Sequence, residues 1–347
     1  MTTISHLERE IHEQPDASAR LLDRESTHVL TIAKAIRQFN PEYVVIAARG
    51  TSDNAARYAQ YLMGSQLGWT VALAAPSLHT LYKTPPQMGR ALVIGISQSG
   101  QSEDVRQVIA DARSQGAITV SITNDSASPL AGLASYHLPL HAEKEHAVAA
   151  TKTYTAELMA MAMLTAAIRD GAGFEGAMAH VPAAMRHTLE LARPLLDWTP
   201  NYGSLSRYAV LGRGFNYATA YEISLKIKEL CYVPGEEYSE ADFRHGPIAV
   251  VKPGFPVIVV NPSGVPFPLL LDLIQKMKDR SADTIVISDS DEAAPLASHF
   301  IKTAQVEEWL SPLVCVIPGQ MLAMGWAMAR GNSLDAPTGL SKVTNTV

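Results

Sequence analysis

The stretch Tyr43-Val-Val-Ile-Ala-Ala-Arg-Gly-Thr-Ser52 decides the fold class, because a short apolar run ends in a glycine turn that opens a helical pattern. A run that is apolar at every position is typical of a parallel strand buried on both faces. Similar runs alternate with longer helical patterns along the chain, and this alternation predicts an α/β fold. The predicted strands are Tyr43–Ala47, Ala91–Ile96, Ile118–Thr123, His137–Leu140, Tyr208–Leu211, Pro256–Val260, Thr284–Ser288 and Phe300–Thr303.

The second set of strands repeats the first at a nearly constant offset of about 165 residues. The offset pairs Ile46 with Leu211, Ile96 with Val260, and Ser121 with Ile287. The turn after the first strand also recurs, as Ala-Arg-Gly at 48–50 and Gly-Arg-Gly at 212–214. Self-similarity at a fixed period indicates a duplicated unit. We therefore predict two tandem, doubly wound, flavodoxin-like subdomains, each with a parallel sheet flanked by helices.

The remaining segments complete the domain organisation. Residues 171–200 read as a glycine turn followed by a helix over 177–196 that ends near Pro200. The predicted parts are a helical arm at 1–29, a first subdomain at 30–170, a connector at 171–200, a second subdomain at 201–335 and an irregular tail at 336–347.

Composition excludes several classes of partner. The formal net charge of −6 gives no electrostatic reason to expect nucleic acid or an acidic membrane surface. The charged amino terminus has no apolar secretory core, and the apolar stretch 158–168 is too short to cross a bilayer. Only two cysteines are present, which is typical of a reducing compartment. We expect a cytoplasmic protein with no membrane span.

Two hydroxyl-rich turns follow the first and second strands of the first copy, where an open parallel sheet binds its ligands. Hydroxyl groups and helix N-terminal amides can hold a phosphate without lysine. Taken singly, such residues are often only helix caps. The matching turns of the second copy, Arg-Gly-Phe-Asn and Asn-Pro-Ser-Gly, lose the hydroxyl cluster. We therefore predict one phosphate site, in the first copy, built from Thr51, Ser52, Ser97, Gln98, Ser99 and Ser102.

Glu222, Lys226 and Glu229 share one face of the helix that follows the first strand of the second copy. Their spacings of four and three residues are also those of an ordinary salt-bridged surface. The same helix carries a neighbouring apolar stripe, predicted to be buried, at Ile223, Ile227 and Leu230.

His245 lies in the Arg-His-Gly-Pro segment that follows this helix. Proton transfer between adjacent carbons of a sugar needs a carboxylate base, a group that opens the ring and a cation near the developing oxyanion. Glutamate, histidine and lysine supply that set. The sequence shows no dinucleotide or nucleotide phosphate loop and no nucleophile elbow, and His146 beside Glu145 reads as structural or solvated. We expect no metal and no cofactor.

Several ordered segments resemble the tandem sugar isomerase (SIS) domains of glucosamine-6-phosphate synthase and its stand-alone relatives. The resemblance covers the chain from about residue 30. It rests on Arg-Gly-Thr51-Ser52, Ser97-Gln98-Ser99-Gly100, Val148-Ala-Ala-Thr-Lys152, Leu211-Gly-Arg-Gly214, 222–229, Arg244-His245-Gly-Pro247 and Leu340-Ser341-Lys342.

The resemblance implies a role for each matched residue. The hydroxyl turns would bind the phosphate and nearby hydroxyls, with backbone contacts from Val148. Glu229 would move the proton between carbons 1 and 2, and His245 would open the ring. Lys226 and Glu222 would support the site, and Lys342 would close over the sugar. The resemblance also implies at least a homodimer, in which the His245 loop reaches the partner's site.

The synthase carries a glutaminase domain that a chain beginning Met-Thr-Thr has no room for, so glutamine-dependent synthesis is not expected. The favoured activity is that of a hexosamine-6-phosphate deaminase/isomerase, converting glucosamine 6-phosphate into fructose 6-phosphate and ammonia. A fructosamine-6-phosphate deglycase, or another phosphosugar aldose–ketose isomerase, is the alternative. A catalytically inactive sugar-phosphate sensor is disfavoured because Glu229, His245 and Lys342 are all retained.

Overall fold

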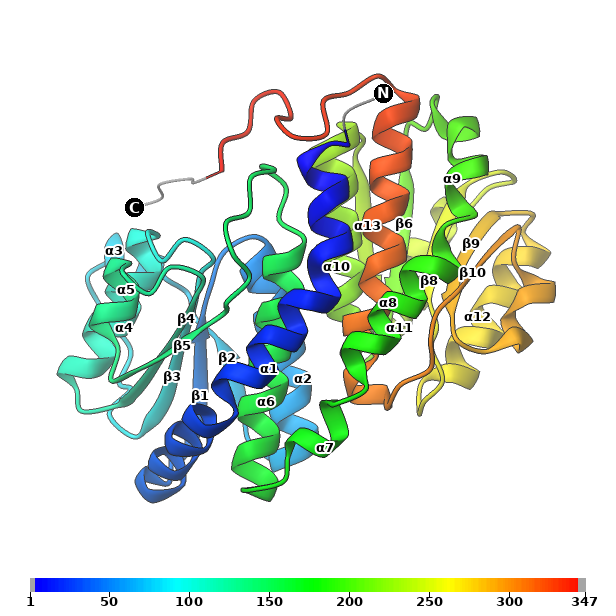
Figure 1. Cartoon of the computed structure of the whole chain (residues 1–347). Coiled ribbons are helices and arrows are strands. Elements are labelled where there is room, and N and C mark those ends of the chain that lie inside the picture. Colours follow the sequence, from blue (N-terminus) through cyan, green and yellow to red (C-terminus); the bar gives the residue numbers. More distant parts are fainter. Residues whose placement is uncertain (1–3, 343–347) are drawn as a thin grey trace. The chain divides into compact units, whose positions relative to one another are not determined.

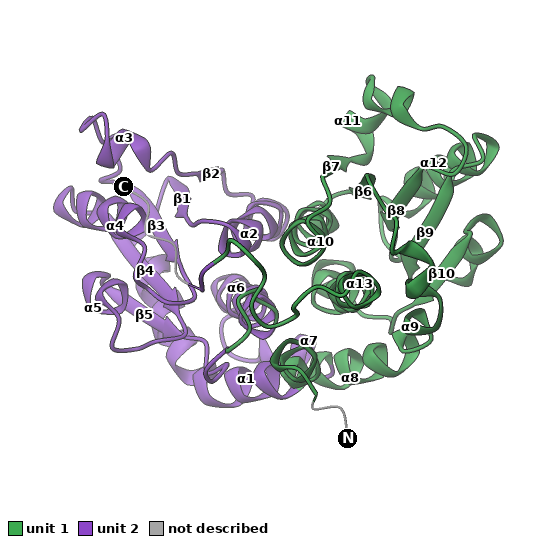
Figure 2. Ribbon diagram, turned by 90° about the horizontal axis from the view of Figure 1, so that it is seen from above, with its two compact units in different colours: residues 1–15, 146–151, 181–340 green, residues 16–145, 152–180, 341–347 purple. Residues whose placement is uncertain are grey.

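The computed structural model describes residues 4–342 and divides into two compact units (Figures 1 and 2). Unit 1 contains residues 1–15, 146–151 and 181–340, and unit 2 contains residues 16–145, 152–180 and 341–347. The first helix, α1 (His6–Phe39), continues from unit 1 into unit 2 after Pro15. The end of the predicted tail, 343–347, lies outside the described residues.

Unit 2 is built on a five-stranded parallel sheet with the order β2-β1-β3-β4-β5. Its strands are β1 (Tyr43–Ala47), β2 (Val71–Leu73), β3 (Ala91–Ile96), β4 (Ile118–Thr123) and β5 (Tyr136–Pro139). Every residue of β3 and β4 is buried, as expected for central strands covered by helices on both faces. The neighbouring strands β1 and β3 are aligned so that Ile46 lies opposite Ile94.

The helices of unit 2 bury one apolar face each. In α4 the residues Val105, Val108, Ile109 and Ala112 recur at helical spacing, and all four belong to a core cluster that includes Val93 of β3. The helices entirely within this unit are α2 (Thr51–Leu67), α3 (Ser77–Thr80), α4 (Glu103–Ser114), α5 (Pro129–Leu133), α6 (Lys152–Asp170) and α7 (Glu175–Met178).

Unit 1 repeats this architecture with the sheet order β10-β9-β8-β6-β7. Its strands are β6 (Tyr208–Gly212), β7 (Gly235–Ser239), β8 (Pro256–Val260), β9 (Asp283–Ser288) and β10 (His299–Lys302). Numbered within each unit, both sheets have the order 2-1-3-4-5, which is the flavodoxin-like arrangement. The predicted α/β fold with a duplicated subdomain is confirmed.

The helices of unit 1 include two that pack closely together, α10 and α13. A Cβ added to Gly319 of α13 would lie 2.2 Å from Cγ1 of Ile223 in α10, so only glycine permits this approach. The unit's helices are α8 (Val181–Ala192), α9 (Leu195–Trp198), η1 (Thr199–Tyr202), α10 (Phe215–Cys231), α11 (Glu240–Arg244), η2 (Pro247–Val250), α12 (Phe267–Asp279), η3 (Asp291–Leu296), η4 (Glu308–Leu310) and α13 (Ser311–Ala329).

Every predicted strand is present, with some ends shifted by one residue. The sequence did not predict β2 and β7, each of which is an edge strand of its sheet. β2 has only three residues, and β7 reads Gly-Glu-Glu-Tyr-Ser, which lacks the apolar run of a central strand. Edge strands need less apolar sequence because they are covered less completely.

The connector differs from the single helix expected over 177–196. The structure has α7, α8 and α9 in this region, followed by η1. Pro182 is tolerated in the first turn of α8, but Pro194 cannot continue a helix and instead begins α9. The segment is therefore a series of short helices.

Among the described residues, one helical segment, Glu308–Ala329, which contains η4 and α13, is long and apolar enough to cross a membrane by length and composition alone. However, 89% of its most apolar stretch is buried inside the protein, which is typical of a core helix. Its counterpart α6, which contains the apolar stretch 158–168, is also buried along nearly its whole length. Both helices therefore serve the cores of their units.

Candidate active site

The two hydroxyl-rich turns of unit 2 follow the adjacent strands β1 and β3. From β1 the chain crosses to β2 on one side, and from β3 it crosses to β4 on the other. This reversal is the topological switch point, where the carboxyl ends of the strands leave a crevice for a ligand. Thr51 and Ser52 open α2 beside this point, and Ser97 through Ser102 form the neighbouring turn.

The Ser52 hydroxyl at the start of α2 has a partner outside its own helix. Gly50 occupies the N-cap position with a φ of 54°, and Thr51 and Ser52 are the first helical residues. The buried Ser52 hydroxyl donates instead to Oε1 of Glu157 in α6, at 2.8 Å. Glu157 is itself buried and fixes the rotamer of Ser52. The simple helix-cap alternative is therefore wrong for Ser52.

The turn after β3 is shaped by its own hydroxyls and by one glycine. Ser97 Oγ accepts from the Gly100 N–H at 3.1 Å, and Ser99 Oγ accepts from the Gln101 N–H at 3.3 Å. Gly100 has a φ of 64°, and a Cβ there would lie 2.2 Å from Ser128 Oγ. Ser102 is the N-cap residue of α4, yet its side chain makes no capping hydrogen bond. Gln98, Ser99 and Ser102 are half-buried, so they remain open to a ligand.

The equivalent turn of unit 1 is already occupied by carboxylates. Glu308 Oε2 accepts from the Val265 N–H at 2.8 Å, and Asp289 Oδ1 accepts from the Ser263 N–H at 2.6 Å. The Glu308 side chain also fills the space beside Gly264, where a Cβ would lie 2.4 Å from its Cδ. A phosphate entering this turn would be repelled by the two carboxylates, and the two backbone N–H groups already donate to them. This contrast supports the prediction of a single phosphate site in the first copy.

A buried charge cluster lies on α10. The side chains of Glu222 and Lys226 are 0% and 1% exposed, and that of Glu229 is 23% exposed. Lys226 Nζ lies 2.5 Å from Glu229 Oε2 and 3.4 Å from Glu222 Oε1. The alternative of a salt-bridged surface is therefore wrong, because the lysine and one of its carboxylates are inside the protein. Buried ion pairs are costly to desolvate, so such a cluster indicates a specific role.

His245 lies apart from this hydrogen-bonded cluster. It ends α11, its backbone N–H donates to the Asp242 carbonyl at 3.1 Å, and its side chain is exposed. Within residues 4–342 the imidazole has no hydrogen-bond or ion-pair partner. The structure thus brings together Glu222, Lys226 and Glu229 but leaves His245 on an exposed loop.

Lys342 is held by a residue that the sequence reading undervalued. Its Nζ lies 2.7 Å from Glu145 Oε2, and the Glu145 side chain is completely buried. Thr153, near the start of α6, donates to the same oxygen through Oγ1 at 2.7 Å. The sequence predicts that the neighbours Glu145 and His146 are structural or solvated. Glu145 is buried and structural, whereas His146 is exposed.

Val148 lies on a short loop of unit 1, residues 146–151. Its N–H donates to the Asp335 carbonyl at 3.0 Å, so its own carbonyl is the backbone group left for a ligand. Beside it, His146 is exposed and stacks on His6 with ring centroids 4.9 Å apart. The structure groups no three potential metal-ligating side chains within its described residues.

Sequence reasoning missed Glu145 and Glu157 as supporting residues. Each holds a predicted site residue through its carboxylate, Lys342 and Ser52 respectively. The available signal was weak: Glu157 is the one charged residue between Lys152 and Arg169 of α6. Such a residue is rarely buried without a polar partner.

The two cysteines are unsuited to nucleophilic chemistry. Both Cys231 and Cys315 are free and buried. Burial raises the pKa of Cys231 to about 12 and also raises the pKa of Cys315. Because the thiolate is the reactive form, neither is an effective nucleophile near neutral pH.

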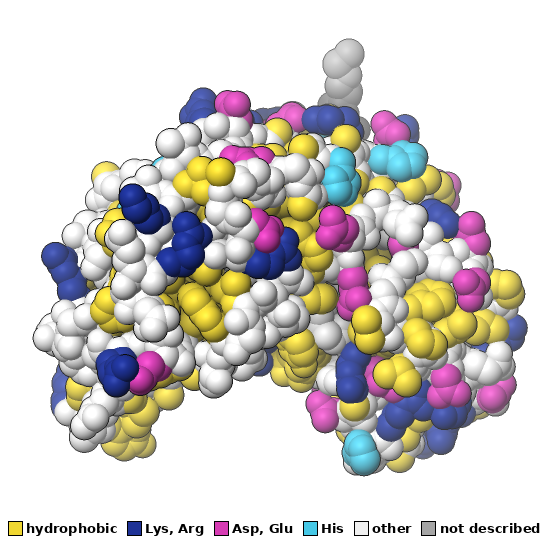
Figure 3. All heavy atoms as spheres, turned by 90° about the horizontal axis from the view of Figure 1, so that it is seen from below, with side chains coloured by type: hydrophobic (Ala, Val, Ile, Leu, Met, Phe, Trp, Pro, Cys, Tyr) yellow, Lys and Arg dark blue, Asp and Glu magenta, His cyan; other side chains and the backbone are white. Residues whose placement is uncertain are grey.

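The face of the molecule drawn in Figure 3 shows no large patch of side chains of a single charge sign. Basic, acidic and apolar side chains are interspersed there among the described residues. This agrees with a ligand held by local groups, as opposed to a broad basic patch.

Comparison with known proteins gives a consistent match. The SIS domain family profile matches residues 39–167 and 205–330. The glutamine–fructose-6-phosphate aminotransferase (isomerizing) of Thermococcus kodakarensis is 31% identical over 344 residues, covering 96% of this chain and 57% of the relative. That of a Thermus thermophilus strain is 33% identical over 355 residues, covering 96% and 58%. The chain thus spans somewhat over half the length of these aminotransferases.

Solved structures agree on the fold. A candidate phosphosugar isomerase from Silicibacter pomeroyi DSS-3 has a TM-score of 0.86 at 31% identity, covering 96% of this chain and 99% of that chain. A glucosamine-6-phosphate deaminase from Thermotoga maritima has a TM-score of 0.83 at 20% identity, covering 99% and 100%. At that identity the second comparison supports the fold alone.

Proposed function

We propose an activity for this chain, which belongs to the SIS domain family of phosphosugar isomerases: it converts glucosamine 6-phosphate and water into fructose 6-phosphate and ammonia. The observation that carries the proposal is the buried cluster on α10. Lys226 lies between Glu222 and Glu229, and Glu229 is the member that remains partly exposed. A carboxylate held by a buried ammonium and open on one side can receive and return a proton.

Phosphate binding is assigned to the turns of unit 2. The half-buried Gln98, Ser99 and Ser102, together with the start of α2, offer hydroxyl groups, an amide and backbone N–H groups at the sheet's switch point. Neutral donors at a helix N-terminus suit a phosphate dianion. The filled turn of unit 1 supports one phosphate per chain.

The proposed reaction proceeds in three proton-balanced stages. His245 takes the proton of the C1 hydroxyl and delivers one to the ring oxygen, which opens the ring to the aldehyde. Glu229 removes the C2 proton while O1 gains a proton, which gives an enolamine. Glu229 then returns its proton to C1 while the amino nitrogen loses one, so that C1 becomes an alcohol and C2 an imine. Water adds to C2 and ammonia leaves, giving the ketone of fructose 6-phosphate. Lys226 holds the Glu229 carboxylate in position, and Lys342 closes over the sugar.

The two cysteines of this chain are unsuited to releasing ammonia from glutamine. A cysteine attacks such a substrate as a reactive thiolate. Both cysteines are buried with raised pKa values, so neither supplies that nucleophile. We therefore write the reaction of this chain with a hexosamine phosphate and water.

We place the reaction in the cytoplasm of a cell, in a dimer in which the His245 loop serves the partner's site. Two free, buried thiols suit a reducing compartment. The exposed His245, which has no side-chain partner within the described part of the chain, suits a residue that completes a site elsewhere.

The deciding experiment measures ammonia release from glucosamine 6-phosphate, galactosamine 6-phosphate and a fructosamine 6-phosphate, together with a coupled assay for fructose 6-phosphate. Equal amounts of ammonia and fructose 6-phosphate from the glucosamine ester support the deaminase. Amino acid released from the fructosamine ester, without ammonia from either hexosamine, identifies a deglycase. Interconversion of aldose and ketose phosphates without ammonia identifies a simple isomerase. No reaction with any substrate contradicts an enzymatic role and favours a sensor.

A further inference from the structure

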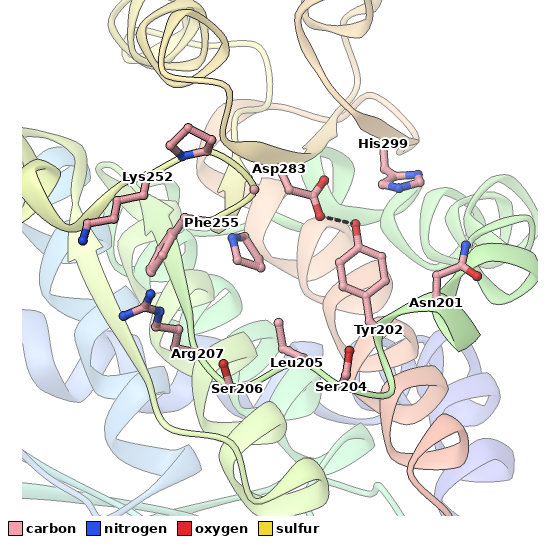
Figure 4. Close-up of a pocket in the computed structure, with 13 residues that line it drawn as sticks. Asn201, Tyr202, Ser204, Leu205, Ser206, Arg207, Lys252, Phe255, Asp283 and His299 are labelled. Carbon is pink, nitrogen blue, oxygen red and sulfur yellow. Dashed lines mark hydrogen bonds between the residues drawn. The ribbon is translucent and has the colours of Figure 1, made fainter.

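A second candidate site lies at the amino-terminal edge of the unit 1 sheet. A cavity of about 500 Å³ opens there, and we call it the amino-edge groove (Figure 4). Its lining includes residues just before or at the start of β6, β8, β9 and β10. None of them is among the residues assigned above to phosphate binding or proton transfer. The volume is within the range of small-molecule sites.

The order of the strands in the sheet determines the order of the lining residues along the groove. Arg207 precedes β6, Phe255 precedes β8, Asp283 begins β9 and His299 begins β10. With the order β10-β9-β8-β6, these residues succeed one another across the edge. Arg207 and Asp283 are two strand spacings apart, which is roughly 10 Å. The cationic and anionic groups therefore belong to opposite parts of one groove.

The cationic end consists of Arg207 and Lys252, which lie on the same side of the groove in Figure 4. The Arg207 guanidinium lies over the Phe255 ring, 5.6 Å from its centroid, which limits its freedom. In the described part of the chain neither cation has a carboxylate partner within ion-pair distance. Two unneutralised cations, of which Arg207 is oriented by the Phe255 ring, lie beside the Ser206 hydroxyl and are suited to a phosphate.

The first copy provides an internal comparison for this end. The residues that precede β1 and β3, equivalent to Arg207 and Phe255, are Glu42 and Arg90. Arg90 Nη2 lies 2.6 Å from Glu42 Oε1, so the cation at that edge is neutralised. The second copy has arginine in place of the glutamate and an aromatic ring in place of the arginine. The charge exposed in the groove is thus a feature of this copy and not of the fold.

The other end presents a fixed hydrogen-bond acceptor. Tyr202 Oη donates to Asp283 Oδ2 at 2.6 Å, as the dashed line in Figure 4 marks. Burial and the neighbouring carboxylate raise the pKa of Tyr202, so the phenol keeps its proton and remains the donor. His299, which stacks on Trp198 with ring centroids 4.1 Å apart, lines the same end. Asp283 Oδ1 is then available to a hydroxyl or an amine.

We propose that the amino-edge groove binds a phosphorylated small molecule of about hexose size, with its phosphate on Arg207 and Lys252 and a hydroxyl or amino group on Asp283. A lone phosphate cannot reach both ends across roughly 10 Å, whereas a phosphorylated polyol can. This site is additional to the substrate site of the proposed function.

The test uses sorbitol 6-phosphate, a phosphorylated polyol without the carbonyl that the proposed reaction needs, in calorimetric titrations of the whole chain. The wild-type chain should bind two equivalents. The double variant Arg207→Ala/Lys252→Ala should lose one of them, with affinity there at least about tenfold weaker because two charge-assisted contacts are removed. The variant Ser97→Ala/Ser99→Ala should lose the other bound equivalent. The two variants therefore distinguish a failure of the amino-edge groove from a failure of the proposed substrate site.

Two further variants make the result specific. Arg90→Ala removes the equivalent cation of the first copy and should leave binding within about twofold of wild type, since it is already paired. Asp283→Ala should weaken sorbitol 6-phosphate at the groove but not inorganic phosphate. Unchanged binding in the Arg207→Ala/Lys252→Ala variant would overturn the proposal. Equal losses in Arg90→Ala, or equal effects of Asp283→Ala on both ligands, would also overturn it. Thermal unfolding confirms that each variant is folded.

Discussion

Lys342 Nζ lies 2.7 Å from the completely buried carboxylate of Glu145, at the last residue that the structure describes. The Lys342 side chain is itself only 24% exposed. Thr153 Oγ1 donates to the same carboxylate oxygen, so Glu145 is fixed from a second side. A buried carboxylate is stable only with such partners. The pair therefore holds Lys342 within unit 2.

The pair predicts that Glu145 acts on the reaction through Lys342. Glu145→Gln and Lys342→Met should each lower kcat/KM by roughly tenfold, because each releases the same tail. The double variant should be little worse than either single variant, as expected for two residues that act as one unit. Steady-state kinetics with glucosamine 6-phosphate measures this. Glu143→Gln, an exposed neighbour, is the control and should match wild type. Additive losses would show that the two residues act independently.

Glu229→Gln should lower turnover by about a hundredfold or more, since a positioned base contributes at least that much. Binding of the phosphate ester should remain nearly unchanged because the hydroxyl turns are untouched. Turnover and equilibrium binding are measured on the same preparation. Glu190→Gln, an exposed glutamate of α8, serves as the control. Turnover within about tenfold of wild type would remove Glu229 from the role of base.

The central strands could be predicted from the sequence because burial on both faces leaves uninterrupted apolar runs, as in β3 and β4. The polar strand β7 and the very short β2 carry no such signal and are defined by pairing with β6 and β1. The break between α8 and α9 depended on Pro194, whose effect on local helix continuity outweighed the apolar periodicity.

The grouping of candidate site residues could be predicted where these residues lie close together in the sequence. The spacing of Glu222, Lys226 and Glu229 placed them on one face, but only the structure shows that Glu222 and Lys226 are buried. The contacts Glu157–Ser52 and Glu145–Lys342 join residues 105 and 197 positions apart. Periodicity carries no information about contacts at that range, so the supporting roles of these carboxylates could be identified only from the structure.

Lys226→Met should destabilise the protein by about 3–5 kcal/mol, because it leaves the buried Glu222 carboxylate without its cation. Urea denaturation followed by circular dichroism measures the loss. Lys228→Met, on the same helix with a half-exposed ion pair to Glu237, should cost no more than about 1 kcal/mol. The double variant Glu222→Gln/Lys226→Met should recover part of the loss. Equal losses from Lys226→Met and Lys228→Met would contradict a buried, paired lysine.

Mixing two inactive variants, Glu229→Gln and His245→Asn, should restore activity if each site takes His245 from the partner. In a hybrid dimer one site then has both wild-type residues and the other has neither. Random reassociation of a symmetric dimer would return roughly a quarter of wild-type activity. The measurement is turnover before and after dissociation and reassociation of the mixture. If no activity returns although hybrid dimers form, the two residues act within one chain.

Stability should fall below about pH 6.5 through His137. The pKa of His137 is lowered from 6.5, first by burial and then by the charges of His28 and His141, against the opposing influence of Glu25. The folded chain therefore resists protonation while the unfolded chain accepts the proton, so this stabilisation is complete above pH 6.5 and is lost as the pH falls through the lowered pKa. His137→Gln, which can still hydrogen-bond Thr123, should show a shallower fall in Tm between pH 7 and pH 5. Parallel pH profiles of Tm for the wild type and the variant would show that His137 contributes nothing to the acid side of the curve.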